Sequence, residues 1–425
     1  MAAGPGDDQV VVAGAGLGGL VAALELGRRG VSTLLIEAQS EVGGRTKTDV
    51  RRGHVEERGA EFYHPEHHVK VEAALRRFGI HSTQMPAWSE RTMMADPWGQ
   101  PRMVSTEVLK QSRLRESVDK DASAQRLDVW WHPEAAQFDI PWLDYVSQLP
   151  GSSLEQSHLM AWLHTLTGTV ASAHSALGVL REIAQFGGLE RVLDAVEYRI
   201  EGGVSRLVRA LFAEVQSYDC VDIWLESPVA SVEQIEAGYQ IKIADGRTVS
   251  AKALIMALPM NVATRLDWHA SMPNPVRRAL AELGPHANQS VKRWFNVEAP
   301  FNDRISGETS AIAFTEAEGE AGCVIAPATH GLAEEAAALG LIAIPTEPSR
   351  CHDWGQDLSA LGAWMTPRVG QIERLHELIS GSEAHPQLQW VGGDWSPVWA
   401  GWMEGALHSG EAAVRRLIDR GLTGA

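Results

Sequence analysis

The first apolar positions of the chain fall into three groups separated by glycine-containing turns. Val10–Ala13 is a short apolar run typical of a buried strand. Residues 17–29 repeat apolar side chains at helical intervals, and residues 31–37 are again apolar and β-branched. A strand, a turn, a helix and a second strand in this order form a βαβ unit. Such units build parallel sheets, so the pattern predicts a parallel-sheet domain at the beginning of the chain.

The pattern changes twice in the middle of the chain. From about Trp88 to Tyr198 it consists of helical stretches rich in Trp, His and Leu and broken by prolines, which predicts a separate, mostly helical insertion. Residues 226–259 then alternate with period two around Ala237–Gly238 and Asp245–Gly246. Both dipeptides are hairpin signals, so we expect an antiparallel sheet there.

A second β-rich segment follows from Ser290, where SVKRWFNVE alternates, with short strands predicted near Ser310 and Val324. The stretch WVGGDW returns to a buried-strand pattern and precedes a helix predicted from about Glu404 to Arg420. The pattern predicts an α/β fold with a Rossmann-type parallel-sheet domain and a second α+β domain, both discontinuous. The first is predicted from residues 1–80, 201–285 and 388–425, and the second, with the helical insertion, from residues 81–200 and 286–387.

Composition limits the function. The 425 residues are enough for two hydrophobic cores, and 44% hydrophobic with 21% charged residues is typical of a globular protein. A formal net charge of −17 argues against nucleic-acid binding, which needs a basic surface. Three widely spaced cysteines favour a reducing compartment and predict neither a disulfide framework nor a zinc site. Because no secretory leader or membrane-spanning run is evident, the expected location is cytoplasmic.

A glycine motif lies between the first strand and the first helix. Gly14, Gly16 and Gly19 form G-x-G-x-x-G. The first glycine permits the tight turn, the second lets the backbone approach a pyrophosphate, and the third lets helix pack on strand. The N-terminus of the helix then faces the anion. Glu37 closes the second strand 23 residues after Gly14, where an acid binds the adenosine ribose. Together these residues predict a dinucleotide site.

A second glycine pair follows almost at once, since Gly43, Gly44 and Arg45 stand in EVGGRTKT. A nicotinamide-binding unit has no need of this pair. Here the chain resembles the FAD-binding family that contains monoamine oxidase, polyamine oxidase, phytoene desaturase and protoporphyrinogen oxidase. The resemblance implies that the glycine pair lets the chain pass close to FAD and that Arg45 contacts the phosphates. It also implies that the second domain binds the substrate.

Other stretches resemble this family in the order in which the family has them. GGVSRLVRAL resembles the segment that restarts the FAD domain, Val229 resembles the residue whose backbone meets the adenine, and ALIMALP resembles the strand that follows. VGGDWSPVWAGWMEGA resembles the closing motif, which implies that Asp394, beside Gly393, binds the ribityl chain. Met403 would open the last helix beside the flavin, where the helix dipole stabilises negative charge.

Three residues are candidates for the flavin face. Lys292, in QSVKRWF, resembles the lysine that amine oxidases hold through a water to flavin N5. Trp402 stands where the family has the tyrosine of GYMEG, and Trp364 follows a stretch similar to the one before the second flavin-facing aromatic. The resemblance implies that both indoles flank the flavin and guide the amine nitrogen. Ala363 falls where covalent relatives have cysteine, which implies non-covalent FAD.

GAEFYHPEHH, which begins at Gly59, resembles the glycine-alanine turn that lines the substrate side in this family. Gly59 and Ala60 are therefore candidates for cofactor contact, and Glu61 and His64 are candidates for the substrate side. Four histidines occur in this stretch and its approach, but no cysteine or spaced acid completes a metal site. We expect pocket or surface histidines here, and no metal.

The expected function is that of an FAD-dependent amine oxidase. In this family a hydride passes from the carbon α to the amine nitrogen to flavin N5, the imine hydrolyses, and O2 reoxidises the flavin with release of hydrogen peroxide. The expected partners are a small-molecule amine and O2, and a homodimer is left open. Two alternatives are a desaturase or protoporphyrinogen-type oxidase acting on C–C bonds, and a non-catalytic binding protein on this fold. Lys292 and the GWMEGA string favour amine oxidation.

Overall fold

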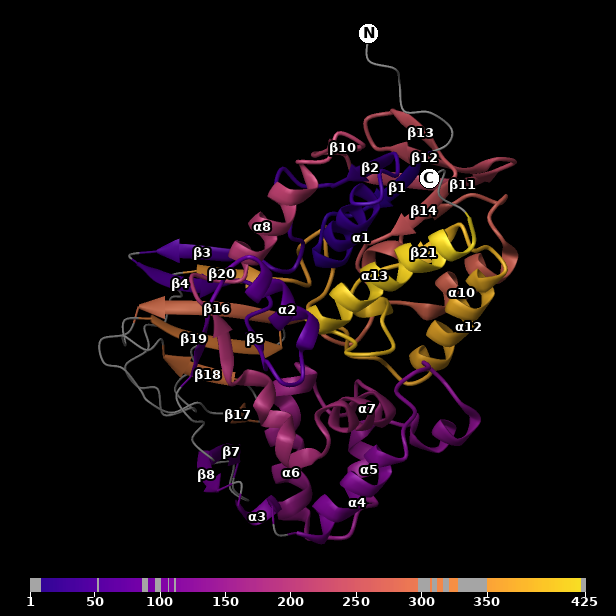
Figure 1. The fold of residues 1–425 in the computed structure, drawn as a ribbon. Coiled ribbons are helices and arrows are strands. Elements are labelled where there is room, and N and C mark those ends of the chain that lie inside the picture. The colour runs from indigo at the N-terminus through magenta and orange to yellow at the C-terminus, as the bar shows by residue number, and fades with distance from the viewer. Residues whose placement is uncertain are drawn as a thin grey trace.

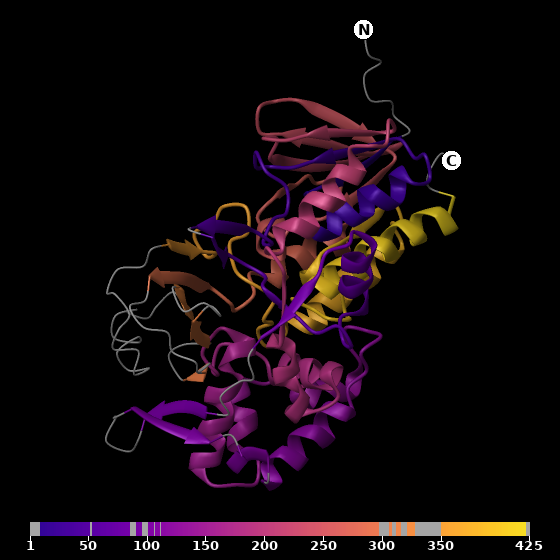
Figure 2. The ribbon, with the colours of Figure 1, turned by 60° about the vertical axis from the view of Figure 1, so that its left-hand side comes forward.

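Figure 1 shows three parts of the molecule: a βα part that contains β1 (Val10–Ala13) and α13 (Met403–Asp419), a smaller sheet beside it, and a group of helices below both. Figure 2 keeps the helical group at the far end from β1 and α13. The computed structural model describes residues 9–51, 53–85, 91–95, 101–105, 107–110, 112–296, 306–307, 312–315, 321–327 and 350–421.

A five-stranded parallel sheet forms the centre of the βα part. Its strands, in spatial order, are β10 (Val221–Trp224), β2 (Thr33–Ile36), β1, β14 (Ala253–Met256) and β21 (Leu388–Trp390). The residues of β1 are fully buried and alternate between two cores: Val10 and Val12 face one, and Val11 and Ala13 face the other. Burial on both faces explains the unbroken apolar run in the sequence.

Different elements cover the two faces of this sheet. On the side of Val10 and Val12 the covering elements are α1 (Leu17–Gly27), α8 (Ser205–Val215) and α13. On the other side they are α10 (Asn274–Leu283), α12 (Gln371–Glu383) and a sheet of β13 (Thr248–Ala251), β12 (Gly238–Ile243), β11 (Val229–Ile235) and β15 (Asp267–Trp268). β11, β12 and β13 are antiparallel neighbours, so the two predicted hairpins are confirmed.

The strands of the central sheet come from the three segments predicted for the first domain. The predicted domain boundary near residue 387, however, does not coincide with a boundary between hydrophobic cores. The structure places α12, from the segment assigned to the second domain, against α10 in the core below the central sheet. The reason is its apolar stripe: Ile372, Leu375 and Leu378 recur at intervals of three residues, and all are buried in that core.

The second part contains an antiparallel sheet whose strands, in spatial order, are β18 (Ile312–Thr315), β19 (Ala321–Pro327), β16 (Ser290–Asn296) and β20 (Arg350–Asp353). The strand predicted near Val324 is therefore confirmed as β19. Ser310 lies outside the described residues, and β18 begins two residues after it.

The predicted helical insertion is confirmed, with strands at its two ends. Its helices are α3 (Glu107–Lys110), α4 (Arg113–Ser123), α5 (Trp142–Ser147), α6 (Ser153–Thr167) and α7 (Ala176–Phe186). Trp88 lies outside the described residues, and the helices follow a hairpin of β7 (Arg91–Ala95) and β8 (Pro101–Ser105). α6 begins with a capping box between Ser152 and Glu155, and α7 begins with the cap Ser175.

The remaining elements connect these parts. They are β3 (Thr48–Arg51), β4 (His54–Glu57), β5 (Phe62–Tyr63), α2 (Val69–Arg77), β6 (Ser82–Gln84), β9 (Tyr198–Ile200), α9 (Met260–Ala263) and β17 (Ser306–Gly307). The last helix covers Met403–Asp419, one residue earlier at each end than predicted. Among the described residues no helix has both the length and the apolar character needed to cross a membrane.

Candidate functional site

A cavity of about 400 Å³ begins at the carboxyl edge of the central sheet. Residues that directly follow strands line it: Gly14 after β1, Glu37 after β2, Ala257 after β14, and Gly392 beyond β21. Ligands of open parallel sheets bind at this edge. The cavity continues to Lys292 and Ile325 of the second part, to Leu166 of α6 in the helical group, and to Trp364 in the chain after β20. It therefore joins the predicted cofactor site to the predicted substrate site.

The three glycines of the first turn meet three different requirements. Gly14 has φ +107°, and a Cβ there would lie 2.5 Å from the Ala257 carbonyl oxygen. A Cβ on Gly19 would lie 1.9 Å from the Gly14 carbonyl oxygen, so this glycine lets α1 pack on the strand turn. A Cβ on Gly16 would meet nothing within 4 Å and would enter the cavity. Gly16 therefore keeps open space in front of the α1 N-terminus, where free N–H groups attract an anion.

Glu37 is held at the edge of this space by backbone groups. Its Oε2 accepts a hydrogen bond of 2.8 Å from the Ala15 N–H, and its Oε1 accepts one of 3.0 Å from the Gln39 N–H. Burial raises the pKa of the Glu37 carboxyl, although these N–H groups oppose the shift. The carboxyl is thus fixed where a ribose hydroxyl would be recognised.

Arg45 and Asp394, predicted to contact different parts of FAD, are paired with each other. Arg45 Nη2 lies 2.8 Å from Asp394 Oδ1, and Arg45 Nη1 donates to the Ala363 carbonyl. Asp394 Oδ2 accepts a hydrogen bond of 2.9 Å from the Met260 N–H. Burial acts to raise the pKa of Asp394, but Arg45, His286 and the Met260 N–H outweigh it, so the pKa lies below its usual value. This network joins four segments of the chain around the middle of the cavity.

The cradle fits a dinucleotide such as FAD. It combines a glycine turn that leaves room at Gly16, a helix N-terminus, and a fixed acid at Glu37. All but one of the predicted cofactor residues line it, namely Gly14, Gly16, Glu37, Gly43, Gly44, Arg45, Gly59, Ala60, Val229, Gly393, Asp394 and Met403. The exception is Gly19, which serves packing behind the turn.

A buried charged group stands at the substrate end. Lys292 Nζ forms an ion pair with Glu61 Oε2 and lies 3.3 Å from the Gly59 carbonyl oxygen. Arg199 Nε lies 2.9 Å from Glu61 Oε1. Lys292, Glu61 and Arg199 are 4%, 3% and 8% exposed. Arg199 approaches Glu61 because its strand, β9, pairs with β5, which begins directly after Glu61. Lys292 comes from a different sheet, on β16.

A second buried carboxyl influences this group. Glu57 accepts hydrogen bonds from the Val204 N–H and the Thr48 hydroxyl. Burial, with a smaller contribution from the nearby Glu61 carboxylate, raises the pKa of Glu57 to about 7.

Both predicted indoles line the cavity, and both of their N–H groups are used within the protein. Trp364 Nε1 donates to the Leu166 carbonyl oxygen over 2.6 Å, and Trp402 Nε1 donates to Glu182 Oε1 over 2.9 Å. Since an indole has one donor and no acceptor, the two side chains present only apolar surface to a substrate. Phe62, Leu166 and Ile325 extend this apolar wall.

His64 does not reach the cavity with the other predicted site residues. The chain turns after β5, where the His67 and His68 N–H groups bond to the His64 carbonyl oxygen. This turn directs the His64 ring toward Tyr198, at a centroid distance of 5.4 Å, and its Nε2 lies 3.5 Å from Glu197. Sequence reasoning missed Arg199 and Glu182, which carry no motif and lie far along the chain from their partners.

A family model described as flavin containing amine oxidoreductase matches residues 17–334 and 332–418. The chain belongs to this family of flavin amine oxidases. As a flavin amine oxidase it is an FAD-dependent oxidoreductase with a mixed α/β fold, as the sequence predicted. The match to an amine oxidoreductase model favours amine oxidation over the desaturase alternative, and the intact cradle argues against the carrier alternative.

Named relatives match along nearly the whole chain. It is 27% identical to (S)-6-hydroxynicotine oxidase of Paenarthrobacter nicotinovorans, over 96% of this chain and 99% of that one. It is 26% identical to nicotine dehydrogenase of Pseudomonas putida, over 97% of this chain and 88% of that one. Putrescine oxidase with putrescine bound has a similar fold, with a TM-score of 0.80, 21% identity and coverage of 97% and 99%. Cyclohexylamine oxidase of Brevibacterium oxydans has a TM-score of 0.78 at 19% identity, covering 98% and 99%.

We expect the FAD of this amine oxidase to be bound non-covalently. Ala363 is 3% exposed, lines the cavity and has no nucleophile with which to bond a flavin. Acid precipitation of the purified protein should therefore release all the yellow chromophore into the supernatant, as FAD. Chromatography of the supernatant and the absorption spectrum of the redissolved pellet test this expectation. Colour that stays with the pellet would contradict it.

Proposed function

We propose that the enzyme oxidises a small, apolar monoamine that binds as the neutral amine, with O2 as the electron acceptor. When bound, FAD supplies the redox chemistry by accepting a hydride. The protein has to orient the amine, exclude water and keep the amine nitrogen unprotonated.

The main support for the proposal is that the carboxylates of the cavity already have partners within the protein. Among the described residues three carboxylates line the cavity, and each already has partners: Glu37 accepts from backbone N–H groups, Asp394 pairs with Arg45, and Glu61 lies between Lys292 and Arg199. A second ammonium on the substrate would thus lose its hydration without gaining a counter-charge, which costs several kcal/mol. This disfavours diamines.

The substrate wall supports the same class of molecule. Phe62, Leu166, Ile325 and the two indoles provide an apolar surface whose indole donors are already occupied. Lys292 lines this end of the cavity, and a nearby cation favours a neutral amine over its ammonium form. The relatives named for nicotine and 6-hydroxynicotine support a cyclic amine attached to a heteroaromatic ring as the first class to try.

A matched pair of amines tests the proposal. Hydrogen peroxide release should be measured with hexylamine and with 1,6-diaminohexane, which differ by one terminal amine, alongside nicotine and 2-phenylpyrrolidine. We expect kcat/KM for the best apolar monoamine to exceed that of the diamine by about a hundredfold or more, which corresponds to roughly 3 kcal/mol. A diamine that is oxidised as well as every monoamine would contradict the proposal.

A further inference from the structure

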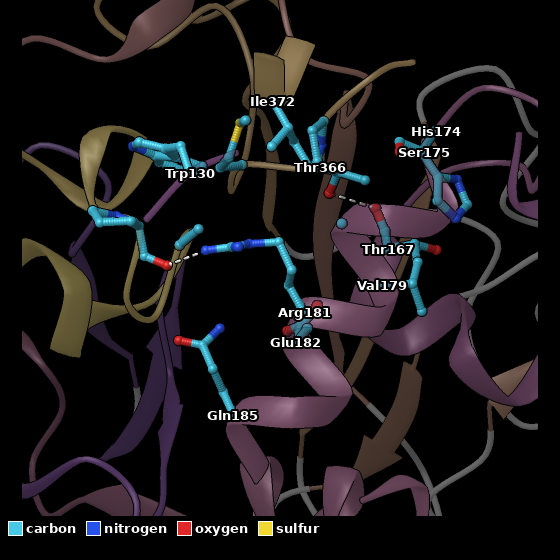
Figure 3. Close-up of a pocket in the computed structure, with 15 residues that line it drawn as sticks. Trp130, Thr167, His174, Ser175, Val179, Arg181, Glu182, Gln185, Thr366 and Ile372 are labelled. Carbon is cyan, nitrogen blue, oxygen red and sulfur yellow. Dashed lines mark hydrogen bonds between the residues drawn. The ribbon is translucent and has the colours of Figure 1, made fainter. Parts of the chain in front are cut away.

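Three side chains on one side of α7 form hydrogen bonds to the loop that carries Trp402. Arg181 Nη2 donates to the Pro397 carbonyl oxygen over 2.9 Å. Glu182 Oε1 accepts from Trp402 Nε1, and Gln185 Oε1 accepts from the Trp399 N–H. Figure 3 shows Arg181, Glu182 and Gln185 extending from one stretch of helix, with the Arg181 bond drawn as a dashed line. Positions i, i+1 and i+4 of a helix lie on one side, so α7 meets the loop at three points.

The loop is held in a conformation that it would not adopt alone. Trp399 has φ +56°, a left-handed value that is rare for a bulky side chain. Such backbone conformations persist where the surroundings fix them. Here Gln185 binds the Trp399 N–H, and the Phe186 ring packs edge-on against Trp399 at a centroid distance of 4.9 Å.

The Trp402 ring packs against two neighbouring aromatic rings. Phe186 lies 5.6 Å from it and His68 lies 4.9 Å from it, centroid to centroid. The χ2 torsion of tryptophan is broad and roughly two-fold, and apolar contacts of this kind tolerate both ring orientations. The single N–H distinguishes them, since only one orientation brings Nε1 to Glu182.

Glu182 is well suited to hold this bond. Together with Pro397 and Ala400 of the loop, it lines a cavity of about 30 Å³, which has room for one or two waters. Burial raises the pKa of the Glu182 carboxyl to about 8, although the Trp402 bond opposes the shift. The acid and carboxylate forms can both accept a hydrogen bond, so the bond does not depend on the protonation state.

We propose that Glu182 is a positioning residue, which fixes the Trp402 indole as one wall of the amine site through the Glu182–Trp402 hydrogen bond. The inference rests on the proposed function, because it takes Trp402 as a wall that the substrate touches. It assigns to the helical insertion a role in specificity: α7 orients Trp402, and the α6 carbonyl of Leu166 orients Trp364.

A double-mutant cycle tests the proposal. Glu182→Gln keeps an acceptor, whereas Glu182→Leu removes it. With the best apolar monoamine, we expect kcat/KM to stay within about twofold for Glu182→Gln and to fall about tenfold for Glu182→Leu, the size of one lost hydrogen bond. In a Trp402→Phe background, Glu182→Leu should cause no further loss, because the indole N–H is already absent.

Nuclear magnetic resonance can detect the Glu182–Trp402 hydrogen bond without enzyme turnover. In protein labelled with ¹⁵N-indole tryptophan, the Trp402 signal is identified by its absence from Trp402→Phe. It should shift in Glu182→Leu and remain near its original position in Glu182→Gln. FAD content and melting temperature should be compared in all variants.

The outcomes separate the two proposals. An equal loss from Glu182→Leu in both backgrounds, or an unmoved Trp402 signal, would overturn the positioning role alone. The positioning role of Glu182 would also be overturned if Trp402→Phe lowered kcat/KM and Glu182→Leu did not. If Trp402→Phe itself left kcat/KM unchanged, the wall assigned to Trp402 in the proposed function would be wrong, and the role of Glu182 would be lost with it.

Discussion

Gly16→Val should give a folded protein that has lost its flavin. A Cβ on Gly16 meets no protein atom within 4 Å, and the φ of −68° suits any residue, so the native fold has room for the side chain. The isopropyl group would occupy the space in front of the α1 N-terminus, where the pyrophosphate has to approach the backbone. Loss of a glycine N-cap costs about 1 kcal/mol of stability at most. Absorption spectra, circular dichroism and thermal unfolding measure the two effects separately.

Gly19→Val is the matched control. A Cβ at this position would lie 1.9 Å from the Gly14 carbonyl oxygen, so the same substitution three residues later should disrupt the packing of α1 and lower the yield of folded protein. Full FAD occupancy in Gly16→Val would remove the case for this turn as the pyrophosphate site. Equal unfolding of both variants would show that the space at Gly16 is structural.

Lys292→Met should keep the fold and the FAD but slow flavin turnover by about a hundredfold, or roughly 3 kcal/mol. Lys292 is 4% exposed beside Glu61, so its charge acts in a site that water barely reaches. Removing it leaves no orphaned carboxylate, because Arg199 still pairs with Glu61. Stopped-flow mixing should separate anaerobic reduction by the amine from aerobic reoxidation and show which of the two slows.

Lys242→Met is the control for this substitution. Lys242 is exposed on β12, so its replacement should change either rate by less than about threefold. If Lys292→Met behaved in the same way in both half-reactions, Lys292 would lie outside the chemistry. The charged group of Lys292, Glu61 and Arg199 would then be purely structural.

Local rules explain what could be predicted from the sequence. The glycines of the first turn, the acid at Glu37 and the buried β1 run each follow from geometry within a few residues, and the structure places Gly14, Gly16 and Glu37 at one cavity edge. The order of the family motifs located the distant segments. The hairpin turns around residues 236–237 and 244–247 likewise follow from local turn chemistry.

Contacts between distant segments account for what could not be predicted. Glu182 and Trp402 are 220 residues apart, and the helix that carries Glu182 shows only an ordinary amphipathic pattern. Arg199 meets Glu61 because β9 pairs with β5, a pairing that no period in the sequence signals. His64 was expected at the substrate side, but the turn after β5 directs its ring to Tyr198.

Anaerobic mixing of the purified yellow enzyme with amines tests the central claim most directly, because it isolates the transfer of electrons from substrate to flavin. The account predicts that at least one apolar monoamine among nicotine, 2-phenylpyrrolidine and hexylamine abolishes the absorption of oxidised flavin, and that 1,6-diaminohexane does so about a hundredfold more slowly at equal concentration. Flavin that stays oxidised with every monoamine, or that the diamine reduces fastest, would contradict it.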